Sequence, residues 1–371
     1  MASSPLDRVR MAEALALAEA SFGLTEPNPR VGCVIGDETG RVFGRGSTQQ
    51  AGGPHAEVMA LRDAAAAGHD LHGATAWVSL EPCAHHGRTP PCCDALAAAG
   101  IGRVVVALAD PFPQVAGRGI ERLRAAGITV ELADTDQASA AREINIGFFS
   151  RFERGRPWVR LKAAASIDGR TALNNGVSQW ITGPDARRDG HAWRRRASAV
   201  LTGIGTVLAD DPRLDVRLVP SVGQPLRVVV DTRLRLPSTA RLLAPPGRVL
   251  VYTAGEPRAG AALAASGAEI VTAPAAVGHV DLAAVIADLG RRGVNEVHVE
   301  AGPRLNGALL QAGCVDELLL YVAPLLIGPG RPIADRAPLD VLTAAHAFEY
   351  VDVERVGTDL RLRARPRTAA T

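Results

Sequence analysis

Short apolar runs of strand length alternate with helical stretches through the first 150 residues of the chain. Residues 7–21 have an amphipathic pattern, and an Ala-rich stretch over 55–67 ends before Gly68, a common helix terminator. The predicted strands cover residues 31–35, 74–80, 103–109 and 128–132. The predicted helices cover residues 7–21, 55–67, 91–99 and 119–126. Because alternating strands and helices pack as layers around a central sheet, the pattern predicts an α/β fold.

A second alternating series begins after a charged stretch at residues 150–156. Its predicted strands are 158–164, 199–203, 227–231, 248–252, 268–271, 296–300 and 317–323. Its predicted helices are 184–196, 282–291 and 305–311. The restarted pattern predicts two domains, over 1–150 and 151–371. We expect the polar, basic tail at 363–371 to be frayed.

The composition is that of an ordinary globular protein, with 47% hydrophobic and 22% charged residues. No apolar run approaches the length of a membrane span, and residues 1–10 lack the pattern of a secretory signal. The five cysteines are an odd number, and Cys92 and Cys93 are adjacent. This pattern favours free or metal-binding thiols over a disulfide framework, so we expect a cytoplasmic protein without a membrane partner.

The two halves of the chain differ in charge. Residues 1–150 contain 12 arginines and 17 acidic residues, whereas residues 151–371 contain 29 basic and 22 acidic residues. Anionic ligands are therefore expected mainly in the second half.

One predicted helix contains a basic cluster of Arg187, Arg188, Arg194, Arg195 and Arg196. A solvated helix face is the ordinary explanation of such a cluster, but arginines also bind phosphate in a bidentate manner. The acidic first half argues against a nucleic-acid groove, so a small phosphorylated ligand is the preferred partner.

The first half contains a set of residues suited to catalytic zinc. His55, Cys83 and Cys92 provide one imidazole and two thiolates, which leaves a fourth tetrahedral position for water. Glu57 follows His55 by two residues, and the irregular entry at 52–54 would allow both to reach one site. A carboxylate beside zinc-bound water can move protons to a leaving amine.

His-x-Glu followed by Pro-Cys and a further Cys is the signature of zinc deaminases, although eight residues separate these cysteines instead of two. The alternative is a closed structural site completed by Cys93 or His85. Cys33 and Cys314 have apolar surroundings and are expected in the core. His85 and His86 lie in a Gly- and Pro-rich loop, where either solvent or a ligand would face them.

The segments 27–34 (PNPRVGCV), 55–58 (HAEV) and 81–92 (EPCAHHGRTPPC) closely resemble the bifunctional riboflavin-biosynthesis deaminase/reductase family, in which the long cysteine spacing is normal. The resemblance implies a cytidine-deaminase-like three-layer α/β domain with zinc on His55, Cys83 and Cys92. It further implies that Glu57 shuttles protons and that Asn28 contacts the pyrimidine. Phe112 departs from the family, which usually has Asn at that position.

The second half lacks a complete dinucleotide-binding fingerprint. Gly203-Ile204-Gly205 follows an apolar run, but position 208 is Leu where a third glycine would be needed. A turn at 300–303 leads into a helix start at 305–309, where free backbone N–H groups could bind phosphate. A plain strand–turn–helix is the alternative for this segment.

The segments 161–164, 166–170, 178–183 and 205–212 resemble the reductase half of the same family, which is similar in fold to dihydrofolate reductase and uses NADPH. Ala301 replaces the usual second glycine after Glu300. The implied cofactor contacts are Ala164, Trp180, Thr206, Asp210, Gly302, Pro303, Arg304, Leu305, Asn306, Gly307 and Ala308. The implied substrate contacts are Ser178, Arg194, Leu214, Arg217 and Glu300.

The resemblance implies two activities on a phosphorylated pyrimidine. The first is hydrolytic deamination of 2,5-diamino-6-ribosylamino-4(3H)-pyrimidinone 5′-phosphate, and the second is reduction of the ribosyl group by NADPH, which gives 5-amino-6-(5-phospho-ribitylamino)uracil. We expect a homo-oligomer. The alternatives are a tRNA or nucleoside zinc deaminase with a non-catalytic C-terminal domain, and a non-enzymatic protein that binds zinc and nucleotide.

Lys162 is the only lysine among the 41 basic residues. A general preference for arginine explains why lysine is scarce but not why this position keeps one, and chance is the alternative. Lys162 lies in an apolar run, where a buried charge needs a partner. In the resembled family this segment belongs to the reductase centre. We therefore expect Lys162 to be catalytic, either by binding the ribose hydroxyls or by helping the sugar open, with Glu300 as its neighbour.

Overall fold

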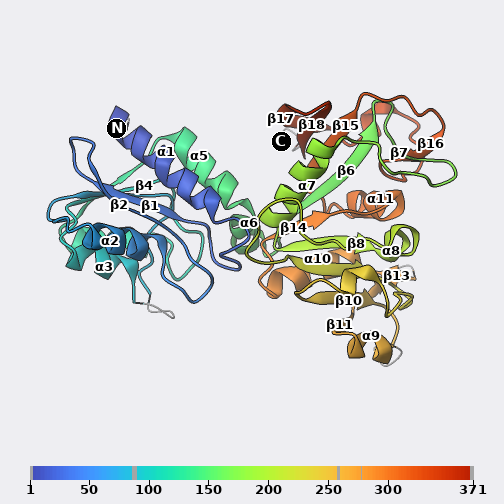
Figure 1. Ribbon diagram of the computed structural model, residues 1–371, viewed down its shortest axis with the longest axis horizontal. Helices are drawn as coiled ribbons and strands as arrows, with labels where there is room; N and C mark the ends of the chain where they lie inside the picture. Colours follow the sequence, from blue (N-terminus) through green and yellow to red (C-terminus); the bar gives the residue numbers. More distant parts are fainter. Residues whose placement is uncertain (1–2, 86–89, 257–259, 277, 368–371) are drawn as a thin grey trace. The chain divides into compact units, whose positions relative to one another are not determined.

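The computed structural model describes residues 3–85, 90–256, 260–276 and 278–367. The chain divides into two compact units, Met1–Gly155 and Arg156–Thr371 (Figure 1). Residues 150–156 were expected to separate the two domains. Part of this stretch forms the end of helix α6 (Ile146–Arg154), which buries Phe148 and Phe149. No helix of the described chain is long and apolar enough to cross a bilayer.

The first unit contains a mixed sheet with the strand order β2-β1-β3-β4-β5. Strand β1 is antiparallel to both of its neighbours, and β3, β4 and β5 are parallel to one another. The strands are β1 (Gly32–Gly36), β2 (Val42–Ser47), β3 (Thr75–Val78), β4 (Arg103–Val106) and β5 (Thr129–Leu132).

Helices cover both faces of this sheet, so the predicted three-layer α/β arrangement is confirmed (Figure 1). Helices α1 (Pro5–Ala20) and α5 (Thr135–Ile144) pack on the face that contains Val34 and Trp77. The opposite face, with Cys33 and Ile35, is covered by α2 (Ala56–Ala66), α3 (Cys92–Ala98) and α4 (Arg118–Ala125).

Strand β2 was not predicted, because its sequence contains two glycines. Both glycines face α2 at close range. A Cβ atom would lie 2.2 Å from the Ala60 carbonyl oxygen at Gly44 and 2.1 Å from that of Ala56 at Gly46. The glycines therefore let the helix that follows His55 pack directly on the strand backbone.

The second unit is built on a larger sheet with the order β11-β10-β9-β8-β14-β6-β15-β18-β17. The strands from β11 to β15 are parallel, and β18 and β17 add an antiparallel hairpin. Its strands are β6 (Trp158–Ser166), β8 (Ala199–Gly203), β9 (Leu226–Val230), β10 (Val249–Thr253), β11 (Ala268–Thr272), β14 (Glu296–Val299), β15 (Glu317–Ala323), β17 (Phe348–Val356) and β18 (Asp359–Pro366). Smaller pairs are β7 (Arg170–Leu173) with β16 (Gly330–Pro332) and β12 (Ala275–Ala276) with β13 (His279–Val280).

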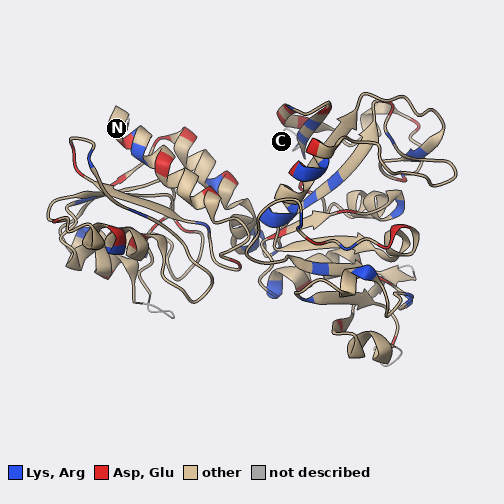
Figure 2. Cartoon of the chain, viewed as in Figure 1, with Lys and Arg blue, Asp and Glu red and all other residues tan. Residues whose placement is uncertain are grey.

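The two faces of this sheet differ in chemistry. Val159 and Leu161 of β6 and Val297 and Val299 of β14 form an apolar core with α10 (Leu282–Arg291) and α11 (Pro303–Gln311). The alternate residues of both strands face helix α7 (Pro184–Arg196), and many of them are charged (Figure 2). Helix α8 (Ile204–Asp210) and the short α9 (Ala261–Ala265) contribute to a separate apolar cluster.

The expectation of a frayed C-terminal tail is wrong for residues 363–366, which belong to β18. Arg363 and Arg365 alternate along this strand, and both donate to Glu317 Oε2, at 3.0 and 2.9 Å. The buried carboxylate of Glu317 on β15 thus holds the polar strand β18. The local sequence of β18 does not reveal this pairing. Residues 368–371 of the predicted tail lie outside the described residues.

Buried charges connect three strands and helix α7. Arg160 is fully buried, and it donates to Glu317 Oε1 at 2.6 Å and to Glu296 Oε2 at 2.9 Å. Arg196 of α7 also donates to Glu296 Oε2, at 2.9 Å. Burial alone would raise the pKa of Glu317, but the charge of Arg160 and the hydrogen bonds from Arg363 outweigh it, and the pKa is lowered.

Replacing Glu317 with Gln should destabilise the second unit, because Arg160 would keep its buried charge while losing one carboxylate partner. We expect a loss of about 3–5 kcal/mol, the usual cost of breaking a buried ion pair. Urea unfolding followed by tryptophan fluorescence is a suitable measurement, since three of the four tryptophans lie in this unit.

Glu354→Gln is the matched control, because the Glu354 side chain pairs with Arg361 but is 55% exposed. We expect it to change the free energy of unfolding by less than about 1 kcal/mol. Equal effects of the two substitutions would contradict the importance of the buried cluster.

Candidate functional site

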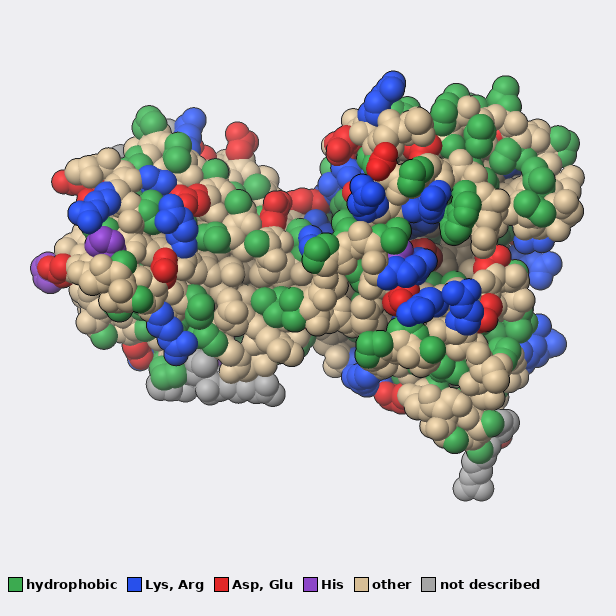
Figure 3. Space-filling model, in the orientation of Figure 1, with side chains coloured by type: hydrophobic (Ala, Val, Ile, Leu, Met, Phe, Trp, Pro, Cys, Tyr) green, Lys and Arg blue, Asp and Glu red, His purple; other side chains and the backbone are tan. Residues whose placement is uncertain are grey.

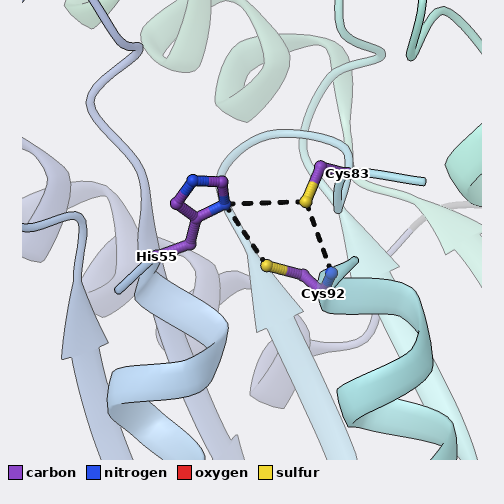
Figure 4. A group of neighbouring side chains, drawn as sticks. All are labelled: His55, Cys83 and Cys92. Atoms are coloured by element: carbon purple, nitrogen blue, oxygen red, sulfur yellow. Dashed lines mark hydrogen bonds between the residues drawn. The ribbon is translucent and has the colours of Figure 1, made fainter. Parts of the chain in front are cut away.

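His55, Cys83 and Cys92 converge in the first unit, and their side chains point toward one another (Figure 4). His55 caps the start of α2, Cys92 is the first residue of α3, and Cys83 lies in the loop between β3 and α3. His55 Nδ1 lies 3.6 Å from Cys83 Sγ and 3.4 Å from Cys92 Sγ. The predicted metal ligands are therefore brought together.

A buried carboxylate holds the backbone around this loop. Glu81, two residues before Cys83, accepts four backbone N–H groups, from Asp110, Gly117, Gly119 and Ile120, at 2.9–3.1 Å. Three of these donors lie at the start of α4, where a negative charge is favoured by the helix dipole. Glu81 is part of the Glu-Pro-Cys motif, but sequence reasoning gave it no role.

Glu57 lies in the first turn of α2, two residues after His55, and is 3% exposed. Burial and the nearby charge of Cys83 raise the pKa of Glu57 to about 7. A carboxyl group with a pKa near neutrality can both accept and deliver a proton, which general acid–base catalysis requires.

The donor set fits zinc. One imidazole nitrogen and two sulfurs lie within 4.8 Å of one another, and Zn²⁺ prefers such nitrogen and sulfur ligands. The Cys92 thiol and the His55 ring stabilise the thiolate of Cys83 by hydrogen bonding, which lowers its pKa despite burial. A thiolate at this position is the form that binds metal.

The alternative of a closed zinc site is not supported by Cys93. Its sulfur is directed to the carbonyl oxygens of Pro82 and Gly119, at 3.3 and 3.4 Å, and it is not part of the ligand cluster among the described residues. Cys33 and Cys314 are buried in hydrophobic clusters, as expected. His86 lies outside the described residues.

Two other residues singled out in the sequence belong to the same unit. Asn28 is half-buried in the loop before β1, and its backbone is bonded to Thr25. Phe112 packs against His85, with ring centroids 5.8 Å apart, and against Phe152 at 5.0 Å. An aromatic cluster thus occupies the position of the expected Asn, close to the loop that contains Cys83.

Sequence reasoning also gave no role to Asp110. This carboxyl is buried, and burial raises its pKa to about 7, with a further contribution from Glu81. The one signal near it in the sequence was the departure from the family at Phe112, two residues later.

A polar cluster in the second unit surrounds Glu300, the residue that follows β14. Arg194 of α7 donates through Nε and Nη2 to the two carboxylate oxygens, the latter at 2.9 Å, and through Nη1 to the Asp215 carbonyl at 2.9 Å. Arg217 donates to Asp215 Oδ1 at 2.6 Å, and its backbone N–H donates to His191 Nδ1 at 3.2 Å. Figure 3 shows basic side chains beside acidic ones on this unit.

Three of the predicted substrate contacts, Arg194, Arg217 and Glu300, therefore belong to one network, which also contains His191 and Asp215. Neither His191 nor Asp215 was predicted. Leu214 is buried beside Asp215 with a φ of 54°, and Ser178 is half-buried in the loop after β7.

Lys162 lies beside Glu300. Strands β6 and β14 pair Leu161 with Val299, so the next residue on each side, Lys162 and Glu300, is also adjacent. Glu300 contributes to the electrostatic environment of Lys162, as predicted. Burial lowers the pKa of Lys162, and its Nζ lies 5.8 Å from the centre of the Tyr321 ring.

The predicted cofactor residues are distributed over four segments. Ala164 is half-buried on β6, Trp180 is 65% exposed beneath Arg187, and α8 contains Thr206 and Asp210. Gly302 caps α11, on which Arg304 and Ala308 are exposed and Leu305 is half-buried.

Two residues of α11 face away from solvent. Asn306 donates to the carbonyls of Ala301 and Ile333, and Gly307 lies against the backbone of Asp335. The Asp335 N–H donates to the Pro303 carbonyl at 2.9 Å. These contacts hold the segment around Ile333 against the helix.

Comparisons with known proteins cover both units. Residues 5–108 match the cytidine and deoxycytidylate deaminase zinc-binding region, and residues 157–362 match the RibD C-terminal domain. The chain is 45% identical to the riboflavin biosynthesis protein RibD of Escherichia coli strain K12 over 370 residues, which cover 96% of this chain and 98% of that protein. The chain belongs to the RibD family.

Solved structures of the family agree over almost the whole chain. Acinetobacter baumannii RibD is similar with a TM-score of 0.89 and 41% identity, covering 98% of this chain and 99% of that one. The Thermotoga maritima diaminohydroxyphosphoribosylaminopyrimidine deaminase/5-amino-6-(5-phosphoribosylamino)uracil reductase has a TM-score of 0.86 and 32% identity, with the same coverage.

Family membership makes the chain a bifunctional deaminase and reductase of riboflavin biosynthesis, with a dihydrofolate-reductase-like second domain. The match across both units favours this family over a tRNA or nucleoside deaminase with a non-catalytic C-terminal domain. It also excludes a protein that only binds zinc and nucleotide.

Cys92→Ser should abolish zinc binding, because the site would lose one of its three ligands. The purified wild-type chain should contain about one zinc ion, measured by atomic absorption. Cys93→Ser is the matched control, since Cys93 is the adjacent residue and its sulfur faces Pro82 and Gly119. Cys33→Ser and Cys314→Ser should also keep zinc. Full zinc content in Cys92→Ser would contradict the assignment.

Proposed function

We propose that residues 1–150 deaminate 2,5-diamino-6-ribosylamino-4(3H)-pyrimidinone 5′-phosphate and that residues 151–371 then reduce its ribosyl group with NADPH. The product would be 5-amino-6-(5-phospho-ribitylamino)uracil. The observation that supports this most directly is the presence of two separate polar centres, one around His55, Cys83 and Cys92 and one around Glu300, in a chain that matches the family throughout.

In the first step, His55, Cys83 and Cys92 would hold zinc, which when bound supplies an activated water near neutral pH. Glu57 would accept a proton from this water and deliver it to the departing amine, which leaves as ammonia. Its burial and its pKa of about 7 support this role. Asn28 would contact the pyrimidine ring.

In the second step, NADPH would supply hydride to C1 of the sugar. Lys162 would bind the ribose hydroxyls or assist opening of the sugar, and Glu300 would orient both Lys162 and the substrate. The position of Lys162 on β6 beside Glu300, which directly follows β14, supports this assignment. We propose the remaining substrate contacts at Ser178, Arg194, Leu214 and Arg217.

For NADPH, we propose contacts with Ala164, Trp180, Thr206, Asp210 and residues 302–308. The start of α11 supports phosphate binding, because its first backbone N–H groups have no partners within the helix. Asn306 and Gly307 both contact the 333–335 segment. We propose that these contacts fix the backbone at the start of α11, where the cofactor would bind.

We further propose that the chain forms a homo-oligomer. Strand β17 is an edge strand, and it exposes Tyr350, Val351 and Val353 at 70%, 43% and 56%. Exposed apolar side chains on an edge strand are typical of surfaces that pair with another chain. Light scattering of the purified protein measures the oligomeric state.

Glu57→Gln should lower the rate of ammonia release by at least about 10²-fold, the low end for general acid–base catalysis. The amide keeps the shape of the side chain but cannot carry the proton. Zinc content should remain near normal, and the reductase rate on deaminated substrate should be unchanged. Unchanged deamination would show that another group moves the proton.

Lys162→Arg should lower NADPH oxidation on deaminated substrate by one to several orders of magnitude, about 1.4 kcal/mol for each tenfold loss. The reason is that a planar guanidinium cannot occupy the tight position of the ammonium. Deamination and folding should be nearly unaffected. A rate within about twofold of wild type at saturating substrate would remove Lys162 from the mechanism.

A further inference from the structure

His298 is a fully buried histidine in the middle of β14. In the strand register it lies between Val200 of β8 and Arg160 of β6. Side chains alternate along a strand, so His298 shares with Glu296 and Glu300 the face that is covered by α7. His298 thus lies on the same face as Glu300, two residues before it, next to the proposed reductase site.

The imidazole has one polar neighbour at close range. Its Nε2 lies 3.4 Å from Glu300 Oε1. Among the described residues, no hydrogen bond of normal geometry reaches either ring nitrogen. Buried polar groups are nearly always paired in folded proteins, so this unsatisfied imidazole needs an explanation.

The charges around the ring determine its protonation state. Burial lowers the pKa of His298, and the cations Arg160 and Lys162 lower it further, against the opposing effect of Glu300. The ring is therefore neutral near pH 7, with one N–H to donate. The titratable and charged groups facing His298 and Glu300 are Arg160 and Lys162 on β6, Glu296 on β14, His191 and Arg194 on α7, and Tyr321 on β15.

The backbone of Glu300 is fixed on both sides. Its N–H donates to the Leu201 carbonyl at 2.9 Å, and its carbonyl accepts from Thr202 Oγ1 at 2.7 Å. Arg194 of α7 binds both oxygens of the carboxylate from one side. A second donor from within the sheet would hold the carboxylate from the other side.

We propose that His298 is a positioning residue of the reductase, which directs a neutral Nε2–H at Glu300 and so holds the carboxylate between Arg194 and Lys162. The inference rests on the proposed function of Glu300 as a substrate contact. It adds a residue that touches neither substrate nor cofactor and acts only through Glu300.

The test compares three variants of the full-length protein, after the wild type has been shown to reduce the deaminated substrate. His298→Met removes the donor and should lower kcat/KM of the reductase about tenfold, the effect of losing a hydrogen bond to a charged group. His298→Gln keeps an N–H donor and should recover most of this loss. Val297→Ala is the matched control, because Val297 is equally buried on the same strand but faces α10 and α11.

The pH profile separates positioning from a structural effect. Loss of the donor raises the pKa of Glu300, so the acid limb of kcat/KM should move to higher pH in His298→Met and not in Val297→Ala. Deamination by the same preparations should be unchanged. A His298→Met enzyme within about twofold of wild type, or the same loss in Val297→Ala, would overturn the proposal.

A spectroscopic measurement tests the proposal without any substrate. In ¹⁵N-histidine-labelled protein, the signal of His298 is the one of nine that disappears in His298→Gln. It should show the neutral Nε2–H form between pH 7 and 8. A signal of the Nδ1–H form, or a ring that becomes protonated in this range, would overturn the proposal even if the proposed substrate were wrong.

Discussion

The burial of charge on one face of the second sheet is the constraint on which this unit depends. Side chains alternate along β6 and β14, so Val159, Leu161, Val297 and Val299 form an apolar core while Arg160 and Glu296 are forced onto the opposite face. Charges in such a position must be paired, and helix α7 and strand β18 supply the partners. Toward the end of the same strands, Lys162 and Glu300 lie beside α7 at the site proposed for the substrate. The proposed substrate site thus continues the row of charged residues that already holds the unit together.

The first unit solves a different problem, which is to bring two sulfurs and one imidazole together beside buried carboxyl groups. It places His55 and Cys92 at helix starts and Cys83 in a loop fixed by the carboxylate of Glu81. Because Glu57 is on the first turn of α2, the helix that positions His55 also positions the proposed proton carrier. The glycines of β2 allow that helix to approach the sheet closely.

Features encoded by neighbouring residues could be predicted from the sequence. His55, Glu57, Cys83 and Cys92 form a compact motif whose chemistry implies their proximity, and the alternation of strands and helices indicated the layered fold. Features that depend on distant pairing could not be predicted. Glu317 holds Arg363 and Arg365 from 46 and 48 residues away, and the polar strand β18 therefore looked like a loose tail. Family resemblance gave Arg194 and Glu300 only as separate substrate contacts, and their ion pair was not predicted, because no local spacing relates residues 106 positions apart.

The alternation along β14 has a further consequence for the fidelity of folding. A slip of one residue in its pairing with β6 would turn Glu296, His298 and Glu300 into the apolar core and place Val297 and Val299 against the arginines of α7. Glu296 and Glu300 would then lose their arginine partners at once, so the misaligned sheet would be strongly disfavoured. The residues proposed to take part in reduction would therefore also fix the register of the strand. A correctly folded chain would already have the Glu300 carboxylate in place.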